Sequence, residues 1–196
     1  MDQLDDLNQF IIDYFENNRI EDIEIALNFD EDKKKKAISL HNIIKENIEC
    51  ITKEFYEYNL NYARTKKYFR GKAEIDRLIE TNKKYFQYLF SGPFDINYYH
   101  EKIKIGYKHY LRSIPNGVYL SSLGNLNSIL NKLWREKFED IIELYEAQSI
   151  TSELLFIEVY FTINTYYTFL EKNLVNEKIK IKEILDNIHD GYFIIN

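Results

Sequence analysis

Apolar residues recur every three to four positions along most of the chain, which is the spacing of an amphipathic α-helix. The pattern is clear over residues 4–16, 41–60 and 73–90. Two prolines and six glycines are the main helix breakers, and no run of β-branched residues alternates with polar ones. This pattern predicts an all-α fold with few tight turns.

A further helix is expected between the two prolines, Pro93 and Pro115. Proline lacks a backbone N–H donor and clashes with the preceding turn, so helices usually stop there. Apolar residues between the prolines keep helical spacing, at Ile96, Tyr99, Ile103 and Tyr110. His109 lies near the end of this helix. Gly106, three residues earlier, leaves no side chain on the neighbouring part of its face, so we expect that a flat group can approach there.

Two long helices are predicted after Pro115. In the first, apolar residues alternate at spacings of four and three, at Tyr119, Leu123, Leu126, Leu130 and Leu133. This is an a/d seam, and the pattern continues through Ile141 and Leu144. The second helix, residues 151–173, carries a similar stripe at Leu155, Val159, Ile163, Tyr166 and Leu170. Two such seams can cover a core and still leave one apolar stripe free.

Composition and charge exclude several classes of protein. The 196 residues fit one domain with a small appendage, and the net charge of −6 with scattered basic residues argues against a nucleic-acid partner. The single cysteine, Cys50, excludes an intramolecular disulfide. The N-terminus is acidic and does not resemble a secretory signal, and Glu158 interrupts the most apolar stretch. We therefore expect a cytoplasmic protein that does not enter a membrane.

His109 is the strongest candidate for a metal ligand among four histidines. A haem iron needs an imidazole nitrogen that a rigid element presents to an apolar slot. His109 combines a helical position with the apolar neighbours Ile105 and Tyr110. Of the other three, His41 is expected at the start of a helix and His189 lies in the tail. His100 lies on the same helix as His109 but on its opposite face. By itself, a histidine on an apolar helix is more often a core residue.

The residues around His109 resemble the globin-coupled sensor family. The matching pattern is G-x-F-D at residues 92–95, I-G-x-x-H at 105–109, I-P at 114–115, and a tyrosine ten residues after His109. The resemblance extends over about residues 25–170. It implies a globin fold with an extra N-terminal helix and long last two helices, which we expect to occupy residues 1–175.

The resemblance also implies a haem b site with His109 as the iron ligand. The Phe55–Tyr56 pair would lie on the distal side, where the Tyr56 hydroxyl would hold a bound gas. Leu78 and Thr81 would face that gas. The expected cofactor-binding residues are Phe55, Tyr56, Phe69, Leu78, Thr81, Ile105, His109 and Tyr119, of which Phe69 would pack on the haem edge.

In this family the implied function is gas sensing, of O2 or of NO or CO, without catalysis in the globin domain itself. The last two helices would form a homodimer, with Trp134, Phe138, Phe161 and Phe169 as candidates for its surface. They would pass the ligand state to a C-terminal output module such as a diguanylate cyclase or histidine kinase. Residues 176–196 would be a linker helix and the first strand of a PAS-like module, because their last twelve residues resemble such a strand. A plain terminal helix is the alternative.

Two other functions fit the residues. The chain could be a haem-free, globin-like helical module that binds another protein, or an oxygen-storage or dioxygenase-like globin that acts alone. No metalloprotease, C-x-x-C, P-loop or G-x-S-x-G motif is present, and the paired E-x-x-H motifs of a di-iron bundle are missing. The sequence therefore predicts a binding domain rather than an enzyme.

Overall fold

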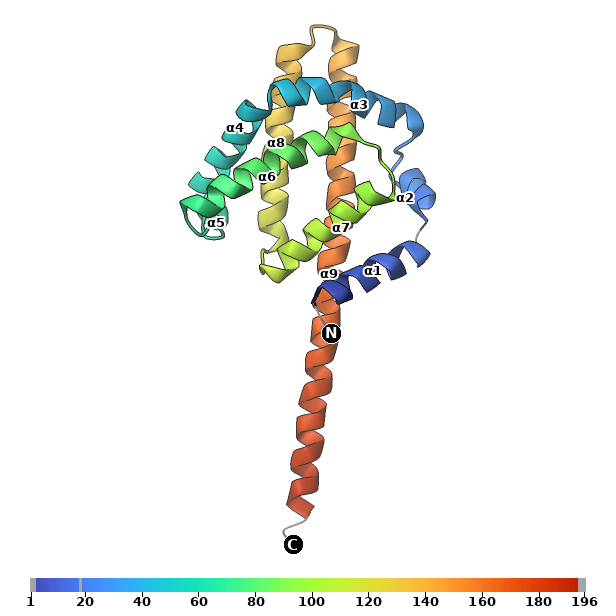
Figure 1. Cartoon of the computed structure of the whole chain (residues 1–196), viewed down its shortest axis with the longest axis vertical. Coiled ribbons are helices and arrows are strands. Elements are labelled where there is room, and N and C mark those ends of the chain that lie inside the picture. The colour runs from blue at the N-terminus through green and yellow to red at the C-terminus, as the bar shows by residue number, and fades with distance from the viewer. Residues whose placement is uncertain (1–2, 18, 194–196) are drawn as a thin grey trace.

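The computed structural model describes residues 3–17 and 19–193, and this part of the chain contains nine α-helices and no strand (Figure 1). The helices are α1 (Gln3–Asn17), α2 (Ile20–Ala26), α3 (Glu31–Glu46), α4 (Ile48–Asn61), α5 (Ala63–Lys66), α6 (Lys72–Ser91), α7 (Ile96–Leu111), α8 (Asn116–Lys137) and α9 (Ile141–Phe193). The predicted all-α fold is confirmed, including the extra N-terminal helix and the two long last helices.

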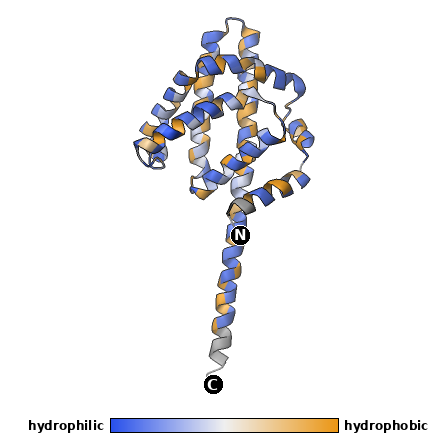
Figure 2. Ribbon diagram, in the orientation of Figure 1, coloured by the Kyte–Doolittle hydropathy of each residue, from blue (hydrophilic) through white to orange (hydrophobic). Residues whose placement is uncertain are grey.

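The helices surround an antiparallel pair formed by α8 and α9 (Figure 1). Helix α7 packs on α9, whereas α4 packs on α8 and supports α6, and α3 lies across α6 and α9. Apolar residues gather on the inward faces of these helices (Figure 2). Helix α9 then leaves the body and continues alone as the longest element. None of the described helices combines the length and apolar composition that a membrane span needs.

Aspartate side chains begin three of these helices. The Asp30 carboxylate accepts the Lys33 N–H at 3.0 Å, and Asp95 accepts the Tyr98 N–H at 3.1 Å. Asp140 accepts the N–H groups of Ile142 and Glu143 at 2.8 and 3.0 Å. The prediction that the helix after Pro115 continues through Ile141 and Leu144 is therefore wrong, because a turn and this cap separate α8 from α9.

Three aromatic side chains that we expected on a dimer surface lie inside the chain instead. Trp134, Phe161 and Phe169 expose 0, 1 and 6% of their surface, and the Trp134 Nε1–H donates to Thr151 Oγ1 at 2.8 Å. Phe138 is half-buried beside Trp134. Trp134 therefore joins α8 to α9 within one molecule, whereas Phe161 and Phe169 of α9 pack against rings of α1 and α7. The expectation that these three residues form a dimer surface is wrong.

Helix α7 crosses α9 in close contact at Gly106. A Cβ atom at this position would lie 2.5 Å from the Thr162 carbonyl oxygen and 2.8 Å from the Thr165 Cβ. The face beside Gly106 is therefore filled by the backbone of α9, and the expectation that a flat group approaches there is wrong. Glycine instead lets two helices approach more closely than any other residue would allow.

The C-terminal segment is helical where the resemblance to a PAS module implied a strand. Helix α9 continues through Phe193, so residues 185–193 have helical backbone. The remaining residues of the expected strand, 194–196, lie outside the described part of the chain. Along residues 171–188 every side chain is exposed, and at the start of this part Lys172 Nζ still lies 5.5 Å from the ring centroid of Phe10 on α1.

We predict that Gly106→Ala destabilises the protein by about 1–3 kcal/mol, the usual cost of overpacking a tight contact. The neighbour that must move is helix backbone, which cannot turn aside as a side chain can. Gly124→Ala is the matched control: it lies in α8 with nothing within 4 Å of the new methyl group, so it should gain about 0.5–1 kcal/mol from helix propensity. Urea unfolding measures both, and equal effects would contradict the proposed crossing.

Candidate functional site

His109 is presented from the last turn of α7 with one ring nitrogen engaged. Its Nδ1 lies 2.8 Å from the carbonyl oxygen of Ile105, one turn earlier. A carbonyl can only accept, so Nδ1 carries the proton and Nε2 keeps its lone pair. Within the described residues, Nε2 makes no hydrogen bond. A metal-binding histidine has this arrangement, in which the bond at one nitrogen fixes the ring and leaves the other free.

Burial keeps the His109 imidazole neutral. Loss of solvent lowers the pKa of His109, and the bond to Ile105 offsets only part of that effect. The neutral form is the one that can coordinate a metal, because protonation would occupy the lone pair of Nε2. The site therefore offers an uncharged nitrogen ligand at ordinary pH.

Tyr119 of α8 packs against the His109 ring, with the two ring centroids 4.7 Å apart. Its hydroxyl does not reach back to the imidazole but donates to Glu158 Oε1 at 3.0 Å and lies 3.3 Å from Thr162 Oγ1. Burial raises the pKa of the Tyr119 phenol well above its usual range, so the group stays a donor. The structure thus brings Tyr119 to His109 as a packing partner whose polar end is held by α9.

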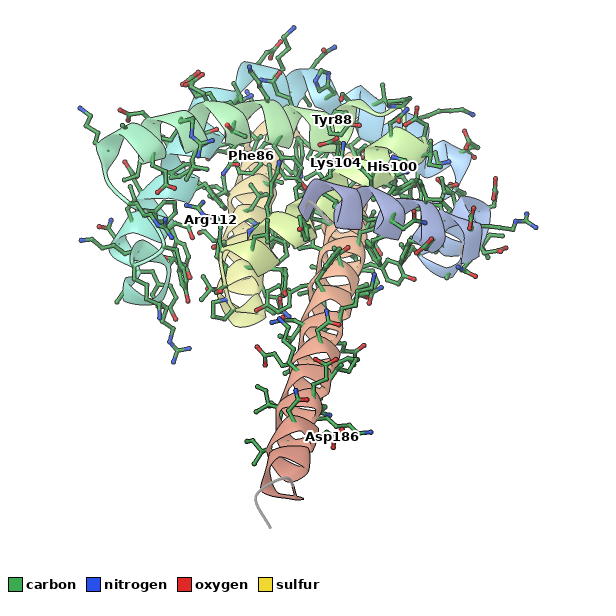
Figure 3. All side chains as sticks on the ribbon, turned by 60° about the horizontal axis from the view of Figure 1, so that its bottom comes forward. Phe86, Tyr88, His100, Lys104, Arg112 and Asp186 are labelled. Atoms are coloured by element: carbon green, nitrogen blue, oxygen red, sulfur yellow. The ribbon has the colours of Figure 1, made fainter. Side chains whose placement is uncertain are left out.

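His100 does not share this position. It lies in the first turns of α7, toward α1, as Figure 3 shows, and its ring centroid is 5.0 Å from that of Phe15. Burial lowers the pKa of His100 as well. His100 and His109 therefore face different neighbours, in agreement with the helical rotation between them.

The other predicted residues lie on α4, α6 and the segment that joins α5 to α6, which we call the second wall of the site. The first wall is the part of α7 and α8 that carries His109 and Tyr119. Tyr56 of α4 is 3% exposed, and burial raises the pKa of its phenol, so the hydroxyl keeps its proton. The Tyr56 oxygen accepts a hydrogen bond from Asn82 Nδ2 at 2.8 Å. Because the oxygen accepts there, its own proton is free to be donated elsewhere.

Aromatic rings hold Tyr56 on this wall. The Phe69 ring centroid lies 5.9 Å from that of Tyr56, and the Phe55 centroid lies 5.5 Å away. Phe55 in turn packs edge-on against Phe86 of α6 at 5.1 Å. The structure therefore brings together Phe55, Tyr56 and Phe69, three of the residues that the sequence predicted.

Thr81 lies apart from this group. Its side chain is exposed, and its hydroxyl donates to the carbonyl of Arg77 at 2.9 Å within the same helix. The residue at the Tyr56 hydroxyl is Asn82, which the sequence reasoning missed. A signal was present, because Asn82 is a polar residue in the apolar stripe of Ile75, Ile79 and Phe86, with spacings of four, three and four.

Half-buried apolar side chains lie on the elements that carry the two walls and pack against the core. They are Phe69, Ile75, Leu78, Ile79 and Leu123. The predicted residue Ile105 is also half-buried and supplies the carbonyl that holds His109. An ion pair between Glu74 and Arg112 joins the first turn of α6 to the end of α7, at the opposite end of α7 from His100 (Figure 3).

These features define a class: a globin-type helical domain with one neutral histidine and a neutral tyrosine on separate walls. The chain belongs to the Protoglobin family, whose model matches residues 16–172. This match confirms the resemblance that the residues around His109 indicated.

Two solved structures have the same fold. The globin domain of the Geobacter sulfurreducens globin-coupled sensor is 20% identical, with a TM-score of 0.70, over 74% of this chain and 96% of that one. The globin domain of E. coli DosC, in a ferric form, is 13% identical, with a TM-score of 0.65, over 75% of this chain and 99% of that one. No curated protein sequence matches the chain.

Proposed function

We propose that the chain is a haem-based gas-sensing domain in which Nε2 of His109 ligates the iron of haem b. The observation that carries the proposal is the hydrogen bond from His109 Nδ1 to Ile105, which leaves Nε2 unengaged on a neutral ring. Membership of the Protoglobin family and the likeness to two sensor globin domains support it. The half-buried apolar side chains around the two walls suit a flat, largely apolar ring.

When bound, the haem supplies an iron with an open position for a diatomic gas such as O2, NO or CO. The chain's own part on the distal side is to donate a hydrogen bond from Tyr56. Asn82 holds the Tyr56 oxygen so that the proton is available, and the surrounding rings keep water away from it. A donor in a dry site stabilises partial negative charge more than it would in water. We assign this supporting role to Asn82 rather than Thr81, whose hydroxyl is already bonded within α6.

The exposed apolar residues of α9 support a homodimer as the assembly of this domain. Tyr167, Leu174, Ile181 and Ile188 follow one another at intervals of seven residues and expose 49 to 58% of their surface. An apolar residue at every seventh position is typical of a coiled-coil seam. Phe156, 59% exposed, lies farther up α9 on the body. A second copy of the chain, packed in parallel along α9, would cover these residues.

Helix α9 also supports a route to an output module. It carries Glu158 and Thr162 at the His109 side of the body and Ile188 near its far end. A change at His109 would therefore reach a C-terminal signalling domain through a single helix.

The absence of a disulfide partner for the exposed Cys50 within the described residues suits a cytoplasmic protein.

The first prediction from the proposed function tests the iron ligand. Purified protein mixed with haemin should develop a Soret band and melt at a higher temperature, because a ligand that binds only the folded form stabilises it. His109→Ala should lose both effects, whereas His100→Ala, on the same helix, should keep them. A protein that stays colourless would instead favour the haem-free interaction module, and a band that survives His109→Ala would overturn the ligand assignment.

The second prediction concerns the distal donor. Tyr56→Phe should weaken O2 affinity by about 10- to 150-fold, because a hydrogen bond to a charged group contributes roughly 1.5–3 kcal/mol. CO carries less charge and should respond less. Tyr58→Phe is the matched control, since Tyr58 lies on the same helix but bonds to Ser121. Flash-photolysis rebinding measures both gases, and an unchanged O2 affinity in Tyr56→Phe would show that the phenol does not face the gas.

The third prediction concerns the dimer. Ile181→Glu places a charge in the proposed seam and should shift the protein from dimer to monomer in sedimentation velocity. Asn176→Glu, on the opposite face of the same part of α9, should leave the dimer intact. A wild-type protein that sediments as a monomer would rule out this assembly without affecting the haem site.

A further inference from the structure

Lys102 of α7 and Glu158 of α9 form a buried ion pair next to the proposed site. Their side chains expose 0 and 1% of their surface, and Lys102 Nζ lies 2.9 Å from Glu158 Oε2. Two charges are costly to remove from water, and an apolar pair of the same volume is often as stable. Packing of the core therefore does not by itself require a charged pair at this position.

Each charge has one further partner on its own helix and one on another helix. Lys102 Nζ lies 3.1 Å from Tyr85 Oη of α6, and 4.3 Å from the ring centroid of Tyr98. Glu158 Oε1 accepts the Tyr119 hydroxyl of α8 at 3.0 Å and lies 3.3 Å from Thr162 Oγ1. The pair thus connects α6, α7, α8 and α9 at one point.

Both sides of this network lead to His109. Lys102 precedes His109 by seven residues, which is close to two helical turns, so the two side chains lie on nearly the same face of α7. From Glu158, the path runs through the Tyr119 hydroxyl to the Tyr119 ring, whose centroid is 4.7 Å from that of His109. His109 is therefore linked to α9 through its own helix and through its packing partner.

We propose that Lys102 and Glu158 are positioning residues that hold Tyr119 against His109 and make α7 and α9 move together. This inference rests on the proposed function, because its purpose is to carry a change at His109 into α9. A shift of α7 along its axis would separate the two charges where no water can replace either one. Moving α9 together with α7 therefore costs less free energy than breaking the Lys102–Glu158 ion pair. Gly106 lies between Lys102 and His109, where the two helix backbones almost touch, and reinforces the same link.

The test removes both charges at once. Lys102→Met/Glu158→Leu keeps the side-chain volume and leaves no charge unpaired, so the fold should be kept. The urea midpoint should fall only modestly, because the Tyr119 hydroxyl loses its Glu158 acceptor but still has Thr162 Oγ1 3.3 Å away. Hydrogen exchange of the haem-free protein is then compared over residues 103–111 of α7. We expect exchange there to be about tenfold faster in the double variant, because the segment has lost its tie to α9.

The matched control is Lys33→Met/Glu153→Leu. This ion pair, 2.9 Å long, joins α3 to the same helix α9 but does not involve α7. It should leave exchange over residues 103–111 unchanged. If the Lys102 and Glu158 variant exchanges like the wild type there, the pair only fills the core and the inference is wrong.

A second arm uses the haem-loaded protein. In the wild type, CO should change the exchange rate of α9 around residues 158–174, and the double variant should lose most of that change while its Soret band remains. If the wild type binds no haem, the proposed function fails, but the haem-free arm still decides whether the pair ties α7 to α9. Should the double variant not fold, Tyr119→Phe keeps the buried charges and removes only the Tyr119 hydroxyl, with its bonds to Glu158 and Thr162. It should also speed exchange around His109, and an unchanged rate there would count against the inference.

Discussion

The crossing of α7 over α9 is the constraint on which the rest of the site depends. With Gly106 against the Thr162 carbonyl, the two backbones are near van der Waals contact, and α7 cannot rotate about its axis without a clash. That fixes the directions of the residues on either side of Gly106. Helical geometry turns His109 and Lys102 to the same flank of the contact, within about one tenth of a turn of each other. The position of the imidazole is thus set by a residue that has no side chain.

Burial gives the two walls of the site their chemistry. The same loss of solvent lowers the pKa of His109 and raises that of Tyr56, so both groups are neutral at ordinary pH, as the proposed roles of iron ligand and hydrogen-bond donor require. Neither result needs a charged neighbour. Hydrogen bonds then assign the direction of each group, since the Ile105 carbonyl fixes which imidazole nitrogen is protonated and the Asn82 amide leaves the Tyr56 proton free. The charged groups that act on His109, namely Glu158, Arg112 and Lys108, shift its pKa less than burial does.

Much of this could be predicted from the sequence, because helices, caps and the candidate histidine depend on local spacing. Pro115 before α8 and Asp30 at the start of α3 are such local signals. The predictions that were wrong depend on which element packs against a given helix face. An apolar seam is the same whether its partner is the chain's own helix or a second copy, so Trp134 and Phe161 were assigned to the wrong surface. The space beside Gly106 could not be assigned without knowing that α9 fills it.

Thr81 and Asn82 show the same limit at the scale of one residue. Both lie on α6, but one residue is 100° of rotation, and only the packing of α6 on α4 decides which of them meets Tyr56.

The length of α9 gives the buried pair a consequence beyond the body of the domain. No glycine or proline interrupts the helix between Ile141 and Ile188, so it has no built-in hinge. Ile188 is thirty residues past Glu158, about 45 Å along a straight helix. A small tilt of α9 at Glu158 would therefore be enlarged into a sideways displacement at Ile188. The extension is exposed along residues 171–188, and the contact of Lys172 with the Phe10 ring lies at its start, far from Ile188. In the proposed function, a small movement at His109 would act at a distance because a stiff helix runs past the site and out of the body.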